Sequence, residues 1–438
     1  MVLRDLLITP VYFFVLLLLA YQIRPFVTNR QLRPYFIPGL LVRFFGAIAL
    51  GSIYQFYYGG GDTFNYFTHG SRWIWEAFLD DPMIAFKMIF AENVHEGDIY
   101  EYSSHIWYFR DDHSYFVVRI AGWLGLFTFN TYSAVAILFA AFSFSGSWAF
   151  YMAMTERYPA QYKWLAICVL FIPSIFFWGS GILKDTLTFG ALGWAAFAYL
   201  KILRKGFSFS NITILLLACL LIYSIKVYIL MAFVAAIGIS YYLNVVRKFH
   251  FVFKLLVAPV MAVVIAGIGY YVILQIGEDN SKYAIDNIAE TAAITSYDIR
   301  YGWGKDAGSG YDIGMLDGSW GSMFRVAPAA INVSLFRPYL WEVSNPLMLI
   351  SALESAALLL MTIYMFVKGV KIRDIFQDPV IVFCFVFSFV FAFAVGVSTS
   401  NFGTLARYKI PLLPFYTSFL VLIGRLRKRR HSRQKQVA

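Results

Sequence analysis

The sequence has little charge and almost no cysteine. Of its 438 residues, 14% are charged and 60% are hydrophobic, whereas about a quarter of the residues of a typical soluble domain are charged. This shortage of charge excludes a water-soluble domain and indicates a chain that crosses a membrane repeatedly. The three cysteines, Cys168, Cys219 and Cys384, all fall inside apolar runs, so they predict neither a disulfide framework nor a metal site.

Long hydrophobic runs are abundant instead. Runs close to the roughly 20 residues that cross a bilayer predict about eleven spans, and therefore an all-α polytopic fold that forms a single membrane domain, residues 1–438. They begin near Leu7, Pro38, Tyr132, Lys163, Thr186, Ile212, Tyr228, Phe251, Pro346, Pro379 and Ile410. No internal repeat is evident, which argues against the inverted-repeat transporter folds.

Basic residues mark one side of the membrane. Short connectors rich in Lys and Arg occur at residues 24–33, 157–163, 201–205, 247–254 and 368–373, and the tail 425–438 is also basic. The positive-inside rule places all of these on the cytoplasmic side and, with an odd number of spans, the N-terminus outside. The net charge of +11 is then an orientation signal that contacts anionic membrane lipids, and no nucleic-acid partner is expected.

Two long polar segments, residues 59–131 and 278–345, fall on the opposite face. They are too long to be passive connectors, so we expect them to carry the function. In the first, the helical spacing of apolar residues from Trp73 to Phe78 and from Met83 to Phe90 predicts amphipathic helices lying in the membrane interface. Tryptophans in both segments offer stacking surfaces or interfacial anchors, namely Trp73, Trp75, Trp107, Trp303 and Trp320.

The first outer segment opens with a carboxylate after a run of glycines. Asp62 follows Gly59–Gly61 at a membrane boundary, where an acid is costly unless it has a function. It is a candidate general base, and the alternative is a helix N-cap. Asp111 and Asp112 are further candidate catalytic acids, with a simple helix start as the alternative.

Histidine is also concentrated in this segment, which holds four of the six in the chain. These histidines lack the i, i+4 spacing of a helical zinc site, so no metal site is predicted from them.

Cations on the outer face suit a phosphate. Lys184 and Asp185 follow glycines at the start of a helix, a position that favours anions, although a capping Asp and a snorkelling Lys explain them equally. Arg325, Arg337 and Arg407 carry a fixed fork of donors that matches phosphate oxygens. Their alternative role is anchorage to lipid phosphates.

Together these residues predict the transfer of a sugar from a lipid phosphate. One carboxylate takes the proton of the acceptor hydroxyl, and cations hold the leaving phosphate as its charge grows. A single base, Asp62, suffices if configuration inverts. Further candidates for binding substrate are Tyr66, His69, His113, Asp185 and Tyr408.

Four short motifs carry a resemblance. The stretches Gly61–Tyr66, Ser180–Asp185, Arg337–Glu342 and Arg407–Pro414 resemble the GT-C glycosyltransferases and the related O-antigen-type polysaccharide polymerases of bacterial envelopes. The resemblance implies a GT-C-like fold in the bacterial inner membrane, a polyprenyl-phosphate or polyprenyl-diphosphate sugar donor, and a glycan or lipid acceptor. It also implies a catalytic acid in the first outer loop and chemistry on the non-cytoplasmic face.

This sequence departs from that pattern at one point. A second acid often follows the first in such enzymes, but Thr63 follows Asp62. No cofactor is therefore expected, a divalent metal is left open, and Asp111 or Asp112 becomes the candidate second acid.

Three alternatives stand beside the transferase. A repeat-unit polymerase would use the same chemistry. A lipid-linked glycan flippase or transporter should show repeat symmetry or charges near mid-membrane. A multi-span acyltransferase would need a histidine within the membrane, and His250 lies at a cytoplasmic end.

Overall fold

The protein is all-helical over the described part of the chain. The computed structural model describes residues 3–90, 93–301 and 309–437, with side chains for all of these except 251–257 and 426–437. The described residues are 80% helical and contain no strand, apart from an isolated bridge between Gly310 and Asn401. The predicted all-α class is confirmed.

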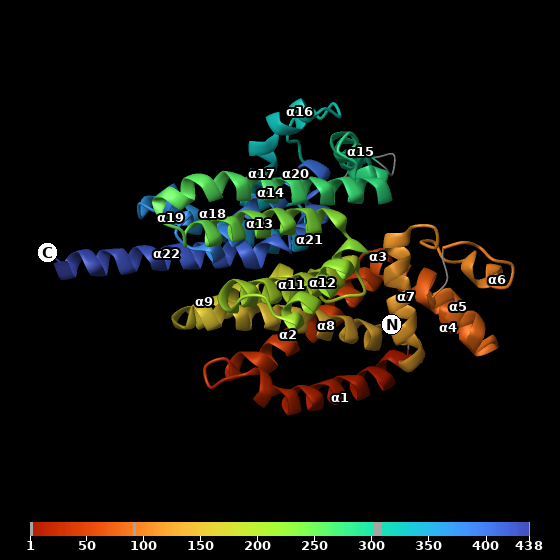
Figure 1. Cartoon of the computed structure of the whole chain (residues 1–438). Coiled ribbons are helices and arrows are strands. Elements are labelled where there is room, and N and C mark those ends of the chain that lie inside the picture. Colours follow the sequence, from red (N-terminus) through yellow and green to blue (C-terminus); the bar gives the residue numbers. More distant parts are fainter. Residues whose placement is uncertain (1–2, 91–92, 302–308, 438) are drawn as a thin grey trace. The chain divides into compact units, whose positions relative to one another are not determined.

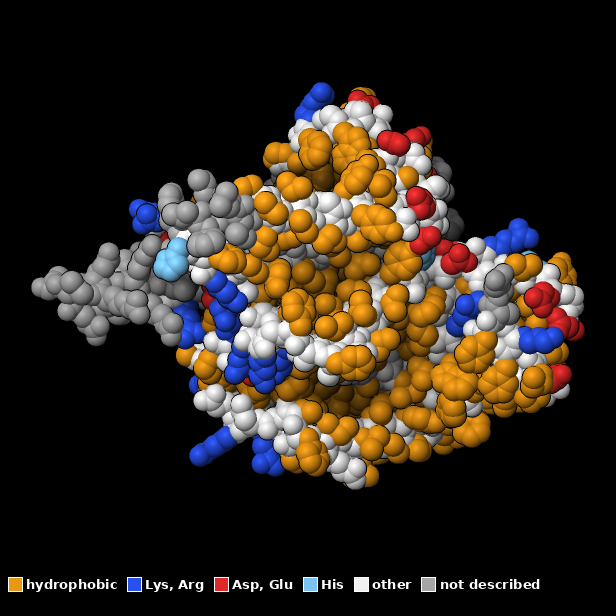
Figure 2. Space-filling view, in the orientation of Figure 1, with side chains coloured by type: hydrophobic (Ala, Val, Ile, Leu, Met, Phe, Trp, Pro, Cys, Tyr) orange, Lys and Arg blue, Asp and Glu red, His pale blue; other side chains and the backbone are white. Residues whose placement is uncertain are grey.

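Eight helices of the described chain are long and apolar enough to cross a membrane. Three shorter apolar helices cover Phe209–Tyr223, Ala327–Phe336 and Leu412–Arg425. Hydrophobic side chains cover most of the face drawn in Figure 2, as expected where the solvent is lipid. The protein is therefore a multi-pass membrane protein, and the count of about eleven spans stays a prediction.

The chain divides into two compact units. Unit 1 comprises Met1–Ala198 and Phe207–Lys226, and unit 2 comprises Tyr199–Gly206 and Val227–Ala438. The helices of unit 1 are α1 (Leu3–Val27), α2 (Arg33–Phe56), α3 (Asp62–Tyr66), α4 (Arg72–Asp80), α5 (Pro82–Phe90), α6 (Tyr100–Ser103), α7 (Asp112–Phe127), α8 (Tyr132–Arg157), α9 (Tyr162–Ala166), α10 (Pro173–Trp178), most of α11 (Lys184–Lys205), and α12 (Phe209–Tyr223). In this unit α2 and α8 lie side by side (Figure 1).

Unit 2 is built around α20. Its helices are α13 (Val227–Val246), α14 (Phe251–Asp279), α15 (Ile288–Tyr301), α16 (Trp320–Arg325), α17 (Ala327–Phe336), α18 (Pro346–Val367), α19 (Ile372–Ile375), α20 (Pro379–Ser398), α21 (Phe402–Tyr408) and α22 (Leu412–Val437). Helix α20 packs against α13, α17 and α22. Its buried Phe383 and Phe387 contact the ring of Phe415 in α22, with centroids 5.6 and 4.4 Å apart.

The helices expected in the first outer segment are present. The predicted stretches from Trp73 and from Met83 fall in α4 and α5, and α4 buries Ile74 and Ala77. Ile74 lies beneath α7, where a Cβ added to Gly122 would come within 2.6 Å of its side chain. Whether α4 and α5 lie in the membrane interface stays a prediction.

One expected span is not a continuous helix. The run from Lys163 is divided into α9, a π-helical turn at Ile167–Phe171, and α10. The break falls at Ile172, whose backbone is extended (φ −69°, ψ 126°) immediately before Pro173. Proline disfavours a helical residue before it and removes a backbone donor, so the proline ends the first half of this segment.

The first helix is tied down by its polar residues. The Asp5 carboxylate accepts a 2.8 Å hydrogen bond from the backbone N–H of Ser133, and Arg4 donates to the carbonyl of Phe129 at 2.9 Å. Since Ser133 lies in the first turn of α8, Asp5 satisfies one of the free N–H groups at that helix start. Arg4 and Asp5 thus fix the start of α1 against the start of α8 and the residues before it.

Helices α8 and α11 touch backbone to backbone. A Cβ added to Gly146 of α8 would lie 1.9 Å from the carbonyl oxygen of Gly190 in α11, and one added to Gly193 would lie 2.3 Å from the carbonyl oxygen of Gly146. Small residues allow this close approach, which is a common basis of helix packing in membranes.

We expect Gly146→Ala to destabilise the protein, because the helices must separate to admit the methyl group. Overpacking of this kind costs about 1–3 kcal/mol. The measurement is the thermal unfolding midpoint of the detergent-solubilised protein. Gly267→Ala is the matched control, since no atom lies within 4 Å of the added Cβ in α14. An equal response of the two variants would contradict the close α8–α11 contact.

Candidate functional site

Asp62 is placed by a glycine hinge. Gly59, Gly60 and Gly61 have φ values of 70°, 141° and 127°, which other residues rarely adopt. A Cβ at Gly61 would also lie 2.6 Å from the ring of Tyr54. Gly61 holds the N-cap position and Asp62 is the first residue of α3, so Asp62 is not the cap that the alternative interpretation proposed.

The residues after Asp62 fix the start of α3. Thr63 Oγ1 lies 2.8 Å from the hydroxyl oxygen of Tyr132 in α8, and Phe64 stacks on the same ring with centroids 4.6 Å apart. Asp62 itself is half-buried. The acid therefore sits on a defined corner rather than on a loose loop.

A double ion pair joins four residues of unit 1. Lys184 Nζ lies 3.3 Å from Asp111 Oδ2, and Lys226 Nζ lies 2.6 Å from Asp185 Oδ1. Lys184 and Asp185 begin α11, Asp111 precedes α7, and Lys226 precedes α13. The pair Lys226–Asp185 is buried, with side chains 8% and 2% exposed, whereas the Asp111 side chain is 51% exposed. We call these four residues the double ion pair.

Asp111 is held in its ionised form. Burial raises the pKa of its carboxyl group, but the charge of Lys184 and hydrogen bonds from Ser114 and Lys184 outweigh it, so the pKa lies below its ordinary value. A carboxylate with a lowered pKa is a weak base. The neighbouring Asp112 is exposed and accepts a hydrogen bond from Asn93. The lowered pKa argues against Asp111 as a base, and the role of Asp62 as a base stays a prediction.

Three predicted substrate-binding residues of unit 1, Asp185, His113 and Tyr66, contact other groups of the protein. Asp185 pairs with Lys226, and Nδ1 of His113 lies 3.0 Å from the carbonyl oxygen of Ser224. Tyr66 is buried against the ring of Tyr108, with centroids 4.9 Å apart.

Two tryptophans that were predicted as stacking surfaces for a substrate stack on histidines of the protein. His69 stacks on Trp107 with centroids 3.8 Å apart, and His105 stacks on Trp73 with centroids 4.1 Å apart. One face of each tryptophan is therefore covered by an imidazole of the same segment. Trp303, also predicted as a stacking surface, lies outside the described residues.

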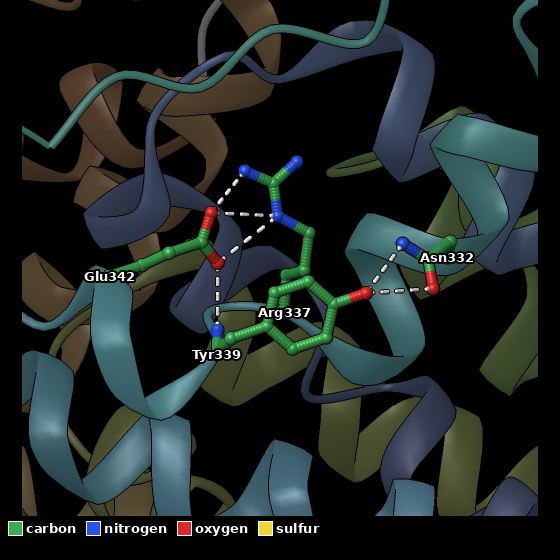
Figure 3. A network of polar contacts seen from close by, with 4 residues as sticks. All are labelled: Asn332, Arg337, Tyr339 and Glu342. Carbon is green, nitrogen blue, oxygen red and sulfur yellow. Dashed lines mark hydrogen bonds and ion pairs between the residues drawn. The ribbon is translucent and has the colours of Figure 1, made fainter.

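Arg337 of unit 2 is paired with Glu342 (Figure 3). Its Nε donates to both carboxylate oxygens at 3.0 and 3.1 Å, its Nη2 donates to Oε1, and the backbone N–H of Tyr339 donates to Oε2 at 2.7 Å. Burial raises the pKa of Glu342, but the bonds from Arg337 and Tyr339 outweigh it and hold the pKa below its ordinary value. The pair is thus ionised and nearly neutral overall.

The backbone of Arg337 is fixed by a buried lysine. Its carbonyl oxygen accepts hydrogen bonds from Ser355 Oγ at 3.0 Å and from Lys409 Nζ at 3.1 Å. Lys409 is fully buried and also donates to Ser355 at 2.8 Å. This contact could not be predicted from the sequence, because Lys409 follows Arg407-Tyr408 as one more basic residue near a span.

The other predicted arginines differ from Arg337. The guanidinium of the half-buried Arg407 lies 5.2 Å from the ring centre of Tyr408, a residue also predicted to bind substrate. Arg325 is exposed at the end of α16. The predicted phosphate-binding residues therefore divide between the units, with Lys184 in unit 1 and Arg325, Arg337 and Arg407 in unit 2.

No metal centre is formed by the described residues, in which no three His, Cys, Asp or Glu side chains gather. Comparison with family models, with curated proteins and with solved structures gives no match. The chemistry of the site must therefore be argued from its own residues.

We expect Lys226→Met to destabilise the protein strongly, because it leaves the buried Asp185 carboxylate without its lysine. Breaking a buried pair from one side costs about 3–5 kcal/mol. Lys184→Met is the matched control, since an exposed partner makes an ion pair worth about 0–1 kcal/mol. Thermal unfolding in detergent compares the two, and a larger loss for Lys184→Met would refute this ranking.

Proposed function

We propose that this protein is a membrane glycosyltransferase of the GT-C kind. It transfers a sugar from a polyprenyl-phosphate or polyprenyl-diphosphate donor to a hydroxyl group of a glycan or lipid acceptor. The observation that carries the proposal is the half-buried Asp62, which follows three glycines whose positive φ values other residues rarely adopt. An acid beside a membrane span is costly and typically marks a functional position.

Asp62 acts as the general base. As the acceptor oxygen attacks the anomeric carbon, its proton passes to the Asp62 carboxylate, and the bond from that carbon to the phosphate oxygen breaks. The electron pair leaves with the lipid phosphate, and configuration at the anomeric carbon inverts.

Lys184 is the cation that meets the departing phosphate. It belongs to the same unit as Asp62, and its side chain is 20% exposed while that of its partner Asp111 is 51% exposed. Water and ions reach such a partner, so a phosphate can replace it on the lysine. Positive charge placed where negative charge develops lowers the barrier to transfer.

The topology that goes with this function requires the broken segment Tyr162–Trp178 to cross the membrane. The basic connector 157–163 precedes this segment, and the positive-inside rule places it on the cytoplasmic side. The segment must therefore cross the membrane for Lys184, which follows it, to lie on the outer face with Asp62. Broken backbone within a membrane is tolerated where protein surrounds it. Contacts of α10 with α2, and of the π-helical turn with α2 and α8, supply those surroundings.

A transporter of lipid-linked glycans is the second candidate. Its support is Arg43, a fully buried charge within the apolar helix α2. However, the guanidinium donates to two serines of α8 and to the carbonyls of Ile175 and Gly179. These partners favour a residue that holds helices together over one that lines a transport path.

Asp62→Asn tests the base. We expect it to lower turnover by at least a hundredfold, because an amide cannot accept the proton, while the unfolding midpoint stays within a few degrees of the wild type. The assay follows radiolabelled sugar from the polyprenyl-phosphate-linked pool of bacterial membranes into product by the purified protein.

Asp98→Asn is the control for that experiment, since Asp98 is an exposed acid of the same segment that pairs with Lys87. Turnover of Asp62→Asn at the wild-type rate would refute the assignment of Asp62 as the base. Absence of sugar transfer by the wild-type protein would refute the proposed function.

A further inference from the structure

The Nη1 group of Arg337 is available to donate hydrogen bonds to a ligand. Its Nε and Nη2 bind Glu342, and its Nη1 has no hydrogen-bond partner among the described residues (Figure 3). The guanidinium carbon lies 5.6, 5.8 and 5.2 Å from the ring centres of Tyr311, Tyr339 and Phe402. Two N–H groups therefore project from a site with aromatic walls.

The charge at this position favours a neutral ligand. Glu342 accepts contacts on both oxygens and neutralises the guanidinium. A phosphate at Nη1 would meet the Glu342 carboxylate nearby, and like charges in a half-buried site repel strongly. A hydroxyl or amide oxygen binds the same N–H groups without that penalty.

An aromatic platform lies beside these donors. The rings of Tyr339 and Trp341 stack with centroids 4.8 Å apart and planes 24° apart, and Trp341 is 80% exposed. Flat aromatic rings next to a few fixed polar groups are the usual composition of small-molecule sites. The C–H face of a sugar ring fits such a platform while its oxygens reach polar groups at the edge.

Tyr339 and the backbone of Arg337 are held in place by contacts within the protein. The Tyr339 hydroxyl exchanges hydrogen bonds with the Asn332 amide at 3.0 and 3.3 Å, and the Arg337 carbonyl is held by Ser355 and Lys409. Preorganised side chains lose little entropy on binding. These contacts suit recognition of a ligand with a fixed ring.

We propose that Arg337, Tyr339 and Trp341 form a subsite for a neutral sugar ring, with Nη1 of Arg337 donating to a hydroxyl or N-acetyl oxygen. This assignment rests on the proposed sugar transfer, and it specifies that unit 2 binds a neutral sugar of the substrate. It replaces the predicted role of Arg337 as a phosphate ligand.

The test compares two probes on the full-length protein in lipid nanodiscs. The first is a printed array of neutral bacterial glycans, and the second is sugar-free undecaprenyl phosphate, whose binding is measured by native mass spectrometry. We expect Trp341→Ala to lower the glycan signal at least tenfold, Trp341→Phe to retain most of it, and both to bind undecaprenyl phosphate as the wild type does.

Trp164→Ala is the control, because Trp164 is a similarly exposed tryptophan, 61% exposed, at the start of the broken segment. Three results would overturn the subsite. The wild type could fail to bind any neutral glycan, Trp341→Ala could leave glycan binding unchanged, as for a membrane anchor, or it could weaken undecaprenyl phosphate equally, as for a lipid contact.

The two proposals fail separately. If Asp62→Asn keeps full turnover while Trp341→Ala loses glycan binding, the catalytic proposal falls and the sugar subsite stands. If Asp62→Asn abolishes transfer while the array shows no neutral glycan bound, the subsite alone falls.

Discussion

The hydrogen bonds of Arg43 stabilise the broken segment Tyr162–Trp178 where it packs between apolar helices. A guanidinium in the middle of α2 is fully buried, and burying such a charge is costly unless its donors are met. Nη1 bonds to the carbonyls of Ile175 and Gly179 at 2.8 and 3.0 Å, and Nη2 bonds to Ser147 Oγ at 2.8 Å. The two Nη groups of Arg43 thus bind the carbonyls of Ile175 and Gly179 at the end of α10 and two serines of α8, while its Nε has no hydrogen-bond partner among the described residues.

The polar residues of unit 1 follow from that arrangement. Helix α10 runs directly into the turn that begins at Gly179 and ends at Lys184, so fixing the Gly179 carbonyl also fixes the start of α11. Lys184 and Asp185 then reach Asp111 and Lys226. A buried charge in α2 is therefore connected, through backbone and ion pairs, to the beginning of α7 and to the outer segment that carries Asp62.

Local features of this chain could be predicted from the sequence, and pairings could not. The glycine run before Asp62 and the apolar spacing in α4 and α5 are encoded within a few residues. The partners of Lys226 and Lys409 lie 41 and 54 residues away, and no local pattern indicates which acid or hydroxyl a lysine will meet. Pro173 was the signal that the expected span from Lys163 is broken.

Pairing also changes which cation can bind a phosphate. Both Lys184 and Arg337 face carboxylates, so neither is a bare positive charge. Glu342 is 19% exposed and accepts several hydrogen bonds from Arg337 and Tyr339, and separating the two side chains would leave a half-buried charge unpaired. The Asp111 side chain is 51% exposed, and an ion pair with such an exposed partner is readily exchanged. Under the proposed function, an incoming phosphate therefore replaces Asp111 on Lys184, whereas Arg337 keeps Glu342 and offers only its outer N–H groups to the proposed neutral sugar.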